Sequence, residues 1–169
     1  GFGLDPRKGL FINSDEIPLA DGLTYNEVFA DGIIDLGLRY REPKSRAEEI
    51  QQRSIFMIDN WCAQYEENVR NLGGIGFYLG GIGPDGHIAF NTKGSDPHST
   101  TRLTHTNFET QAAAAGDLGG IEISRKKPVI TIGLDTIAYN HNATAIIFAA
   151  GEASSQVVAD ALEKTPCNL

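Results

Sequence analysis

The chain has 169 residues, a length typical of one compact domain, and 41% of its residues are hydrophobic. That share can build a core without disulfides or metals, and a charged fraction of 21% argues against extensive disorder. The formal net charge of -8 disfavours nucleic acid and anionic membranes as partners, because both require a positive surface. We therefore expect one folded domain over residues 1–169 that binds neither.

The cysteines, histidines and N-terminus add further exclusions. Cys62 and Cys167 are too far apart in sequence and too few to predict a zinc ribbon or a disulfide scaffold. The four histidines are scattered without the spacing of a metal site. The chain does not begin with a basic and then apolar leader, and no stretch approaches the roughly 20 apolar residues that span a bilayer. We expect a cytoplasmic protein without a metal or a cofactor.

The first half of the chain predicts loops followed by one long helix. Residues 1–43 carry short apolar runs broken by Gly, Pro and Asp, which is typical of short strands and loops. From Lys44 to about Leu72, apolar residues recur at three- and four-residue steps and predict an amphipathic helix. Gly73 and Gly74 end it. The apolar run at residues 75–79 then predicts a short buried strand.

The second half of the chain alternates strands and helices. Residues 80–106 are loop-like, and the later predicted elements are a helix at 108–117, a strand at 128–133, a short helix at 134–139, a strand at 143–150 and a helix at 152–164. Apolar strands without alternation are typical of parallel sheets. We therefore expect an α/β fold with an open, mainly parallel sheet and helices on both of its faces.

The loop after the first predicted strand carries the most informative residues, because ligands bind at the carboxyl ends of parallel strands. Gly81, Gly83 and Gly86 match the pattern G-x-G-x-x-G, but Asp85 inside it and the lack of a following helix argue against a dinucleotide site. Asp85 can instead orient the imidazole of His87 and raise its basicity. That pair suits general acid–base chemistry on a sugar-like substrate. The alternative is that Asp85 caps a turn and His87 packs at the sheet edge.

Residues 79–91 (LGGIGPDGHIAFN) resemble the signature of the glucosamine-6-phosphate deaminases, also called isomerases. Residues 99–102, 129–133 and 143–151 are similar to further segments of that family, as is the helix around Tyr65. The resemblance covers roughly residues 57–167. It implies an open α/β fold shared with phosphosugar isomerases, and conversion of glucosamine 6-phosphate to fructose 6-phosphate and ammonia by an enzyme of hydrolase or isomerase type.

The resemblance also implies roles for individual residues. His87 would open the sugar ring with Asp85 as its orienting partner, and Asp15 would shuttle a proton between C2 and C1. The partner would be a small-molecule phosphosugar, and the protein would be a homo-oligomer or would require the remainder of a longer chain. The implied substrate-binding residues are Gly81, Gly83, Gly86, Asn91, Tyr65 and Arg102.

Several positions depart from that family, so two alternatives stay open. Thr92 stands where the family has a glutamate, and Gly116 and Ser154 stand near its phosphate-binding arginine and lysine. The family's first strand and phosphate loop have no counterpart before Asp15, which predicts a divergent member or a fragment of a larger domain. One alternative is a non-catalytic sugar-phosphate-binding or assembly module on the same fold. The second is a 6-phosphogluconolactonase-like hydrolase, whose loop also carries Gly-x-Asp-Gly-His.

Overall fold

The computed structural model describes residue 5 and residues 8–83, 85–106 and 128–163. The helix expected at 108–117 therefore lies outside the described residues. The helices and strands, in chain order, are α1 (Tyr25–Val28), α2 (Arg46–Asn71), β1 (Phe77–Gly81), β2 (Arg102–Thr104), β3 (Val129–Thr131), α5 (Leu134–Ala138), β4 (Thr144–Phe148) and α6 (Ser155–Glu163). None of the described helices is both long enough and apolar enough to cross a bilayer.

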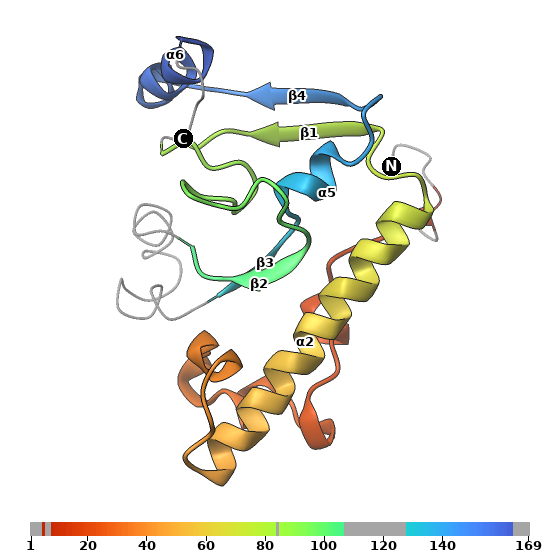
Figure 1. Ribbon diagram of the computed structural model, residues 1–169, viewed down its shortest axis with the longest axis vertical. Helices are drawn as coiled ribbons and strands as arrows, with labels where there is room; N and C mark the ends of the chain where they lie inside the picture. The colour runs from red at the N-terminus through yellow and green to blue at the C-terminus, as the bar shows by residue number, and fades with distance from the viewer. Residues whose placement is uncertain (1–4, 6–7, 84, 107–127, 164–169) are drawn as a thin grey trace.

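Helix α2 is the axis of the molecule and confirms the long helix expected from the sequence (Figure 1). It begins where the Ser45 side chain accepts a hydrogen bond from the backbone N–H of Glu48, which satisfies one of the N–H groups that a helix start leaves without a partner. It ends before Gly73 and Gly74, which adopt φ values of 92° and 79°. Left-handed backbone of this kind favours glycine, so the pair closes the helix.

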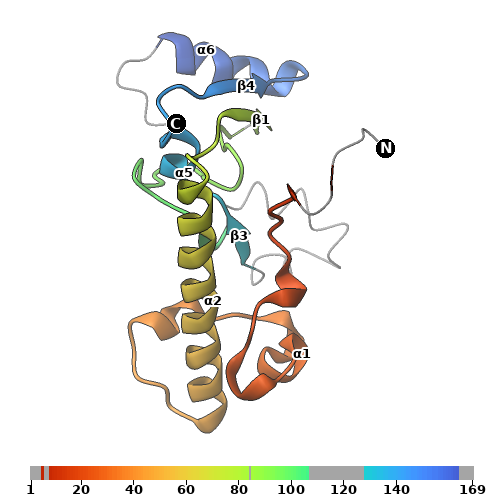
Figure 2. The same cartoon turned by 90° about the vertical axis from the view of Figure 1, so that its right-hand side faces the viewer.

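The N-terminal segment wraps around the lower part of α2 (Figure 2). The strands expected among residues 1–43 are wrong for the described part of that range, which folds into α1 and short 3-10 turns. Each apolar run is too short to pair as a strand, and the turns instead direct single side chains onto α2. The core that results contains Phe29, Leu38 and Ile55, all fully buried.

Strands β1 and β4 pair in parallel, which confirms the parallel α/β arrangement (Figure 1). Their register places Phe77 opposite Thr144 and Gly81 opposite Phe148. The carboxyl end of β1 therefore lies beside the carboxyl end of β4, which leads toward α6. Loops that follow both strands meet at this edge, where a parallel sheet presents its ligand site.

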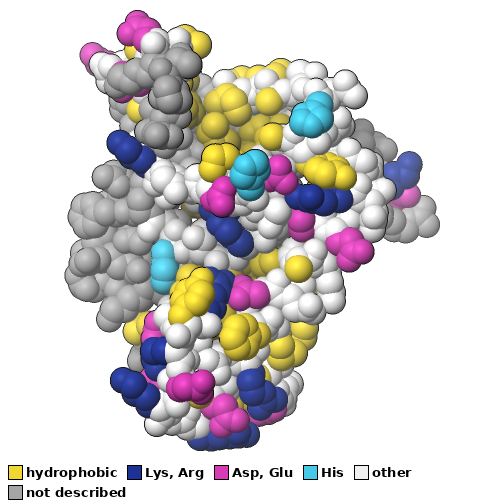
Figure 3. All heavy atoms as spheres, viewed as in Figure 1, with side chains coloured by type: hydrophobic (Ala, Val, Ile, Leu, Met, Phe, Trp, Pro, Cys, Tyr) yellow, Lys and Arg dark blue, Asp and Glu magenta, His cyan; other side chains and the backbone are white. Residues whose placement is uncertain are grey.

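The β1–β4 pair is less buried than the apolar sequence predicts. Successive side chains alternate between faces, so one face presents Phe77, Leu79, Ile146 and Phe148, which are 57%, 58%, 41% and 61% exposed. Tyr78 on the other face is buried. Figure 3 shows apolar side chains gathered in the region of α6 and these strands, and charged side chains around the opposite end of the molecule.

Strands β2 and β3 form a separate antiparallel pair, with Leu103 opposite Ile130. The sequence analysis assigned β2 to a loop, because three residues between polar neighbours give no periodic pattern. Their strand geometry comes from pairing with β3. Leu103 belongs to the core cluster on α2, so this pair connects the helix to the rest of the fold.

Candidate active site

The loop that leaves β1 is folded back on itself by backbone hydrogen bonds. The N–H of Gly86 donates to the carbonyl of Gly83, and the N–H of Gly83 donates to the carbonyl of His87, both at 3.0 Å. Gly86 has a φ of 90°, which favours glycine. A Cβ on Gly83 would collide with the His87 ring, so only glycine allows the ring to lie against the backbone here. These two glycines serve the placement of an imidazole.

The Asp85 and His87 side chains are in direct contact, with 2.6 Å between Oδ1 and Nδ1. Both are largely buried, at 13% and 22% side-chain exposure. An ionised carboxylate only accepts hydrogen bonds, so Nδ1 carries the hydrogen and the basic lone pair is on Nε2. The His87 ring also stacks on Phe90, with 6.4 Å between ring centroids. The ring is therefore fixed in tautomer and orientation, as a general acid–base group must be.

Asn91 and Arg102 tie this loop to the second sheet. Arg102 donates from a terminal guanidinium nitrogen to Oδ1 of Asn91 at 2.8 Å. The Asn91 amide donates to the carbonyls of Ile88 and Ile132, at 3.0 and 2.9 Å. Asn91 is only 4% exposed, so its polar atoms are satisfied inside the protein. Asn91 and Arg102, both predicted to bind substrate, therefore bond each other and fix the loop in place.

Glu66 on α2 is a buried carboxylate that fixes the segment before Arg102. Its Oε2 accepts from the backbone N–H and the hydroxyl of Thr101 at 3.1 and 2.9 Å, and from the hydroxyl of Thr136 at 2.7 Å. Its Oε1 accepts from Arg70 at 2.9 Å. Burial raises the pKa of Glu66, but the hydrogen bonds from Thr136, Arg70 and Thr101 outweigh it and hold the pKa below its usual value. A charged Glu66 therefore joins α2, the residue that precedes β2, and α5.

The start of α5 is locked to the same segment. The N–H groups of Leu134 and Asp135 donate to the hydroxyl and the carbonyl of Ser99, at 3.2 and 2.9 Å. A Cβ on Gly133 would collide with the Ser99 carbonyl, so glycine is required for this approach. Arg70 also pairs with Asp135 at 2.6 Å and lies 4.5 Å above the Tyr139 ring. The residues around the His87 loop therefore form a rigid support.

The structure keeps Asp15 and Tyr65 apart from the His87 contact. Asp15 lies in an exposed 3-10 turn and lines a second cavity, together with Phe90. The Tyr65 hydroxyl donates to the carbonyl of Leu10 at 3.1 Å, and burial raises the pKa of Tyr65. Gly81 sits at the last paired position of β1. The proton-shuttling and substrate-binding roles of these residues stay predictions.

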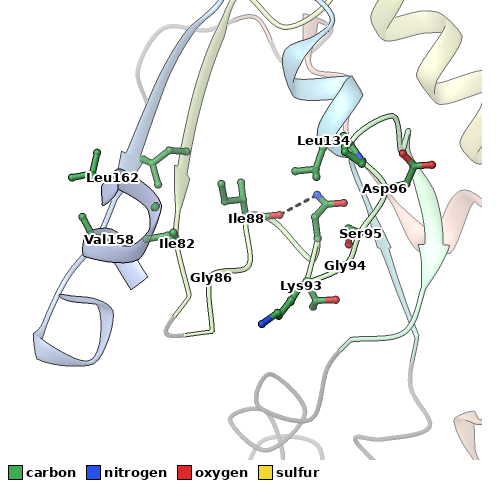
Figure 4. Close-up of a pocket in the computed structure, with 16 residues that line it drawn as sticks. Ile82, Gly86, Ile88, Lys93, Gly94, Ser95, Asp96, Leu134, Val158 and Leu162 are labelled. Atoms are coloured by element: carbon green, nitrogen blue, oxygen red, sulfur yellow. Dashed lines mark hydrogen bonds between the residues drawn. The ribbon is translucent and has the colours of Figure 1, made fainter. Parts of the chain in front are cut away.

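The sequence analysis missed the wall that faces the His87 loop. A cavity of about 890 Å³ lies between that loop, the carboxyl end of the β1–β4 pair, α6 and the turn at residues 92–97 (Figure 4). Gly86 and Asn91, two of the predicted substrate-binding residues, line it, but so do Thr92, Lys93 and Ser95. One signal in the sequence points to Lys93: it comes directly after the resemblance signature and Thr92.

No metal centre is formed by the described residues, since they contain no group of three or more His, Cys, Asp or Glu side chains close enough to hold an ion. Cys62 is buried against Leu103 in the core, and burial raises the pKa of its thiol to about 11. It is a core residue and remains protonated at neutral pH.

Comparisons with known proteins agree on one family. A glucosamine-6-phosphate isomerase of Candida albicans is 39% identical over 90 residues, covering 53% of this chain and 36% of that protein. A glucosamine-6-phosphate deaminase of Caenorhabditis elegans is 42% identical over 76 residues, covering 45% and 28%. The solved structure of a monomeric glucosamine-6-phosphate deaminase, described as a missing link of the NagB superfamily, matches with a TM-score of 0.55 and 30% identity over 63% of this chain and 43% of that one.

The chain resembles the glucosamine-6-phosphate deaminase/isomerase family over part of its length, as a divergent or truncated member would. Its fold is that of the NagB superfamily deaminases. The match spans only about a third of the length of the curated relatives, at 36%, 28% and 39% for three of them. No family model matches the chain.

Proposed function

We propose that the protein converts glucosamine 6-phosphate and water to fructose 6-phosphate and ammonia. The observation that carries the proposal is the 2.6 Å contact between Asp85 and His87, on a loop at the carboxyl end of a parallel strand. Curated relatives named glucosamine-6-phosphate deaminase support the choice of substrate. The names of the relatives support deaminase and isomerase chemistry, so the proposal does not include the hydrolase type that the sequence analysis also gave.

In the proposed reaction His87 opens the sugar ring. Nε2 takes the proton of the C1 hydroxyl and delivers it to the ring oxygen, while Asp85 stabilises the imidazolium that forms between the two transfers. A carboxylate then moves a proton from C2 to C1. Water replaces nitrogen at C2, and ammonia leaves. Ring opening needs a proton carrier of fixed orientation, which is what the Asp85 contact provides for His87.

Asp15 is the proposed carrier of the C2 proton. It lines the cavity on the Phe90 side of the loop, and the Phe90 ring stacks on His87. Phe90 therefore lies between the acid and the imidazole environments. For both groups to act on one sugar, the substrate must reach across the edge of Phe90. Because Asp15 is the carrier of the C2 proton, Asp15→Asn is expected to abolish proton transfer between C2 and C1, while ring opening by His87 persists.

The test is an assay of ammonia and fructose 6-phosphate release from glucosamine 6-phosphate. We expect His87→Gln to remove turnover, because glutamine cannot exchange a proton. His98→Gln is the matched control, since His98 is exposed and its backbone N–H, not its ring, bonds Asp96. A folded wild-type chain that releases neither product, or a His87→Gln variant as active as the wild type, would contradict the proposal.

A second candidate is sugar-phosphate binding without turnover. It is favoured by the position of Asp15, which lines a different cavity from the one beside Gly86. Among the lining residues of that larger cavity Asp96 is the sole acid, and its Oδ1 accepts from the N–H of His98 at 2.8 Å. Calorimetric binding of glucosamine 6-phosphate in the absence of product release would select this candidate.

A further inference from the structure

The cavity beside the His87 loop has two chemically different walls (Figure 4). One wall is apolar and comes from the β1–β4 pair and α6, through Ile82, Ile147, Val158 and Leu162. The other wall is polar and comes from the turn that follows Asn91. At about 890 Å³ the cavity falls in the size range of small-molecule sites.

Lys93 supplies a positive charge to the polar wall. It is the one Lys or Arg among the residues that line this cavity, and it is exposed. The described part of the chain gives it no acidic partner within ion-pair distance. Figure 4 draws the Lys93 amine at the edge of the wall, extending toward the side on which Gly86 lies. An ammonium so placed is available to an anion that enters the cavity.

Arg102 adds a second charge behind the same wall. Its guanidinium donates to Oδ1 of Asn91, to the carbonyl of Thr100 at 3.4 Å and to the Ser95 hydroxyl at 3.5 Å, all of which are neutral. Burial lowers the pKa of Arg102, so its surroundings oppose the charge that it carries. Because Asn91 and Ser95 both line the cavity, an anion there would relieve that cost.

One acid stands on the same wall and limits where an anion can lie. Asp96 lines the cavity and attracts Arg102 electrostatically. Figure 4 places Asp96 at the other end of the turn from Lys93. Repulsion from Asp96 therefore directs an anion to the Lys93 end, next to Thr92 and Ser95, whose hydroxyls can donate hydrogen bonds.

We propose that this wall binds the phosphate group of the ligand, with Lys93 as its direct ion-pair partner and Arg102 as a buried supporting charge. The carbon skeleton would then lie along the loop that carries His87, with the apolar wall excluding water. This inference rests on the proposed function for the identity of the sugar, whereas recognition of phosphate follows from the two cations.

The test is calorimetric titration of the whole 169-residue chain with inorganic phosphate, glucosamine 6-phosphate and glucosamine. We expect both phosphates to bind and glucosamine to bind far more weakly, with affinities that fall as salt is added. Lys93→Gln should raise the Kd for both phosphates about tenfold, the loss expected for a charge-assisted hydrogen bond. Lys93→Arg should keep the affinity. Lys8→Gln is the matched control, because Lys8 is exposed and lines neither large cavity.

Three results would overturn the inference: no phosphate binding by the folded wild type, equal affinity for glucosamine and its phosphate, or an unchanged Kd in Lys93→Gln. Turnover is measured separately on the same samples. Lys93-dependent phosphate binding without turnover would support the inference and contradict the proposed deaminase reaction. Turnover that Lys93→Gln leaves unaltered in KM keeps the reaction and overturns the inference.

Discussion

Ile55 on α2 and Ile146 on β4 are the same residue type in two contrasting regions, at 0% and 41% exposure. The α2 region buries its apolar side chains against the N-terminal turns and Leu103. The β1–β4 region leaves one apolar face bare, yet the candidate active-site loop leaves from its end. The difference teaches that burial of the β1–β4 pair is not what holds the loop in place. The loop is held by polar contacts that lead back to α2.

The largest expected effect tests the contrast in burial directly. Ile55→Ala removes a fully buried side chain and should lower the free energy of unfolding by about 3 kcal/mol. Ile146→Ala should lower it by less than about 1 kcal/mol, because that side chain is already in water. Urea unfolding followed by far-UV circular dichroism measures both. Equal losses would show that the sheet face is covered in solution.

An intermediate effect is expected at the polar link between the regions. Glu66→Gln replaces one carboxylate oxygen with an amide nitrogen, either Oε2, which accepts three hydrogen bonds, or Oε1, which pairs with Arg70. The variant should lower the free energy of unfolding by about 2 kcal/mol. The neighbouring Glu67 is exposed, so Glu67→Gln should be neutral.

The same variant carries a pH signature. Because the pKa of Glu66 is lower in the folded protein than its ordinary value of 4.5, its contribution is present above that value and is lost as the pH falls through the lowered pKa. The stability difference between wild type and Glu66→Gln should therefore shrink below about pH 4.5. A difference that stays constant from pH 7 to pH 3 would contradict the assignment of charge to Glu66.

The smallest effect on stability is expected at Gly83. Alanine there must displace the His87 ring, since the added Cβ would collide with it, and the ring can swing away from Asp85. We expect a loss of about 1 kcal/mol in the free energy of unfolding, typical of a single substitution at a half-buried position, but a large change in the imidazole nitrogen resonances of His87. Gly94→Ala is the contrast, because nothing lies within 4 Å of its added Cβ, although its φ of 83° adds some backbone strain. Unchanged His87 resonances in Gly83→Ala would show that the ring has room.

The sequence predicted the elements that carry a strong periodic pattern and the loop that carries a specific signature. Helix α2, the parallel strands and the short helix α5 repeat apolar residues at spacings that depend only on local geometry. The 3-10 turns before α2 and strand β2 were not predictable, because they take their shape from contacts with α2 and β3. Lys93 was overlooked for a similar reason. Only the folded turn shows that Lys93 lines the cavity and that Arg102 bonds Ser95 in its wall.

The single tryptophan has a consequence for how all these variants are followed. Trp61 lies on α2 and stacks on Tyr65 with 5.4 Å between ring centroids. Its fluorescence therefore monitors the helix and the adjoining N-terminal segment, and the β1–β4 strands contribute no indole. Emission and circular dichroism curves that coincide in urea would mean that the molecule melts as one cooperative unit. Curves that separate would mean that the α2 region and the β1–β4 region unfold at different urea concentrations.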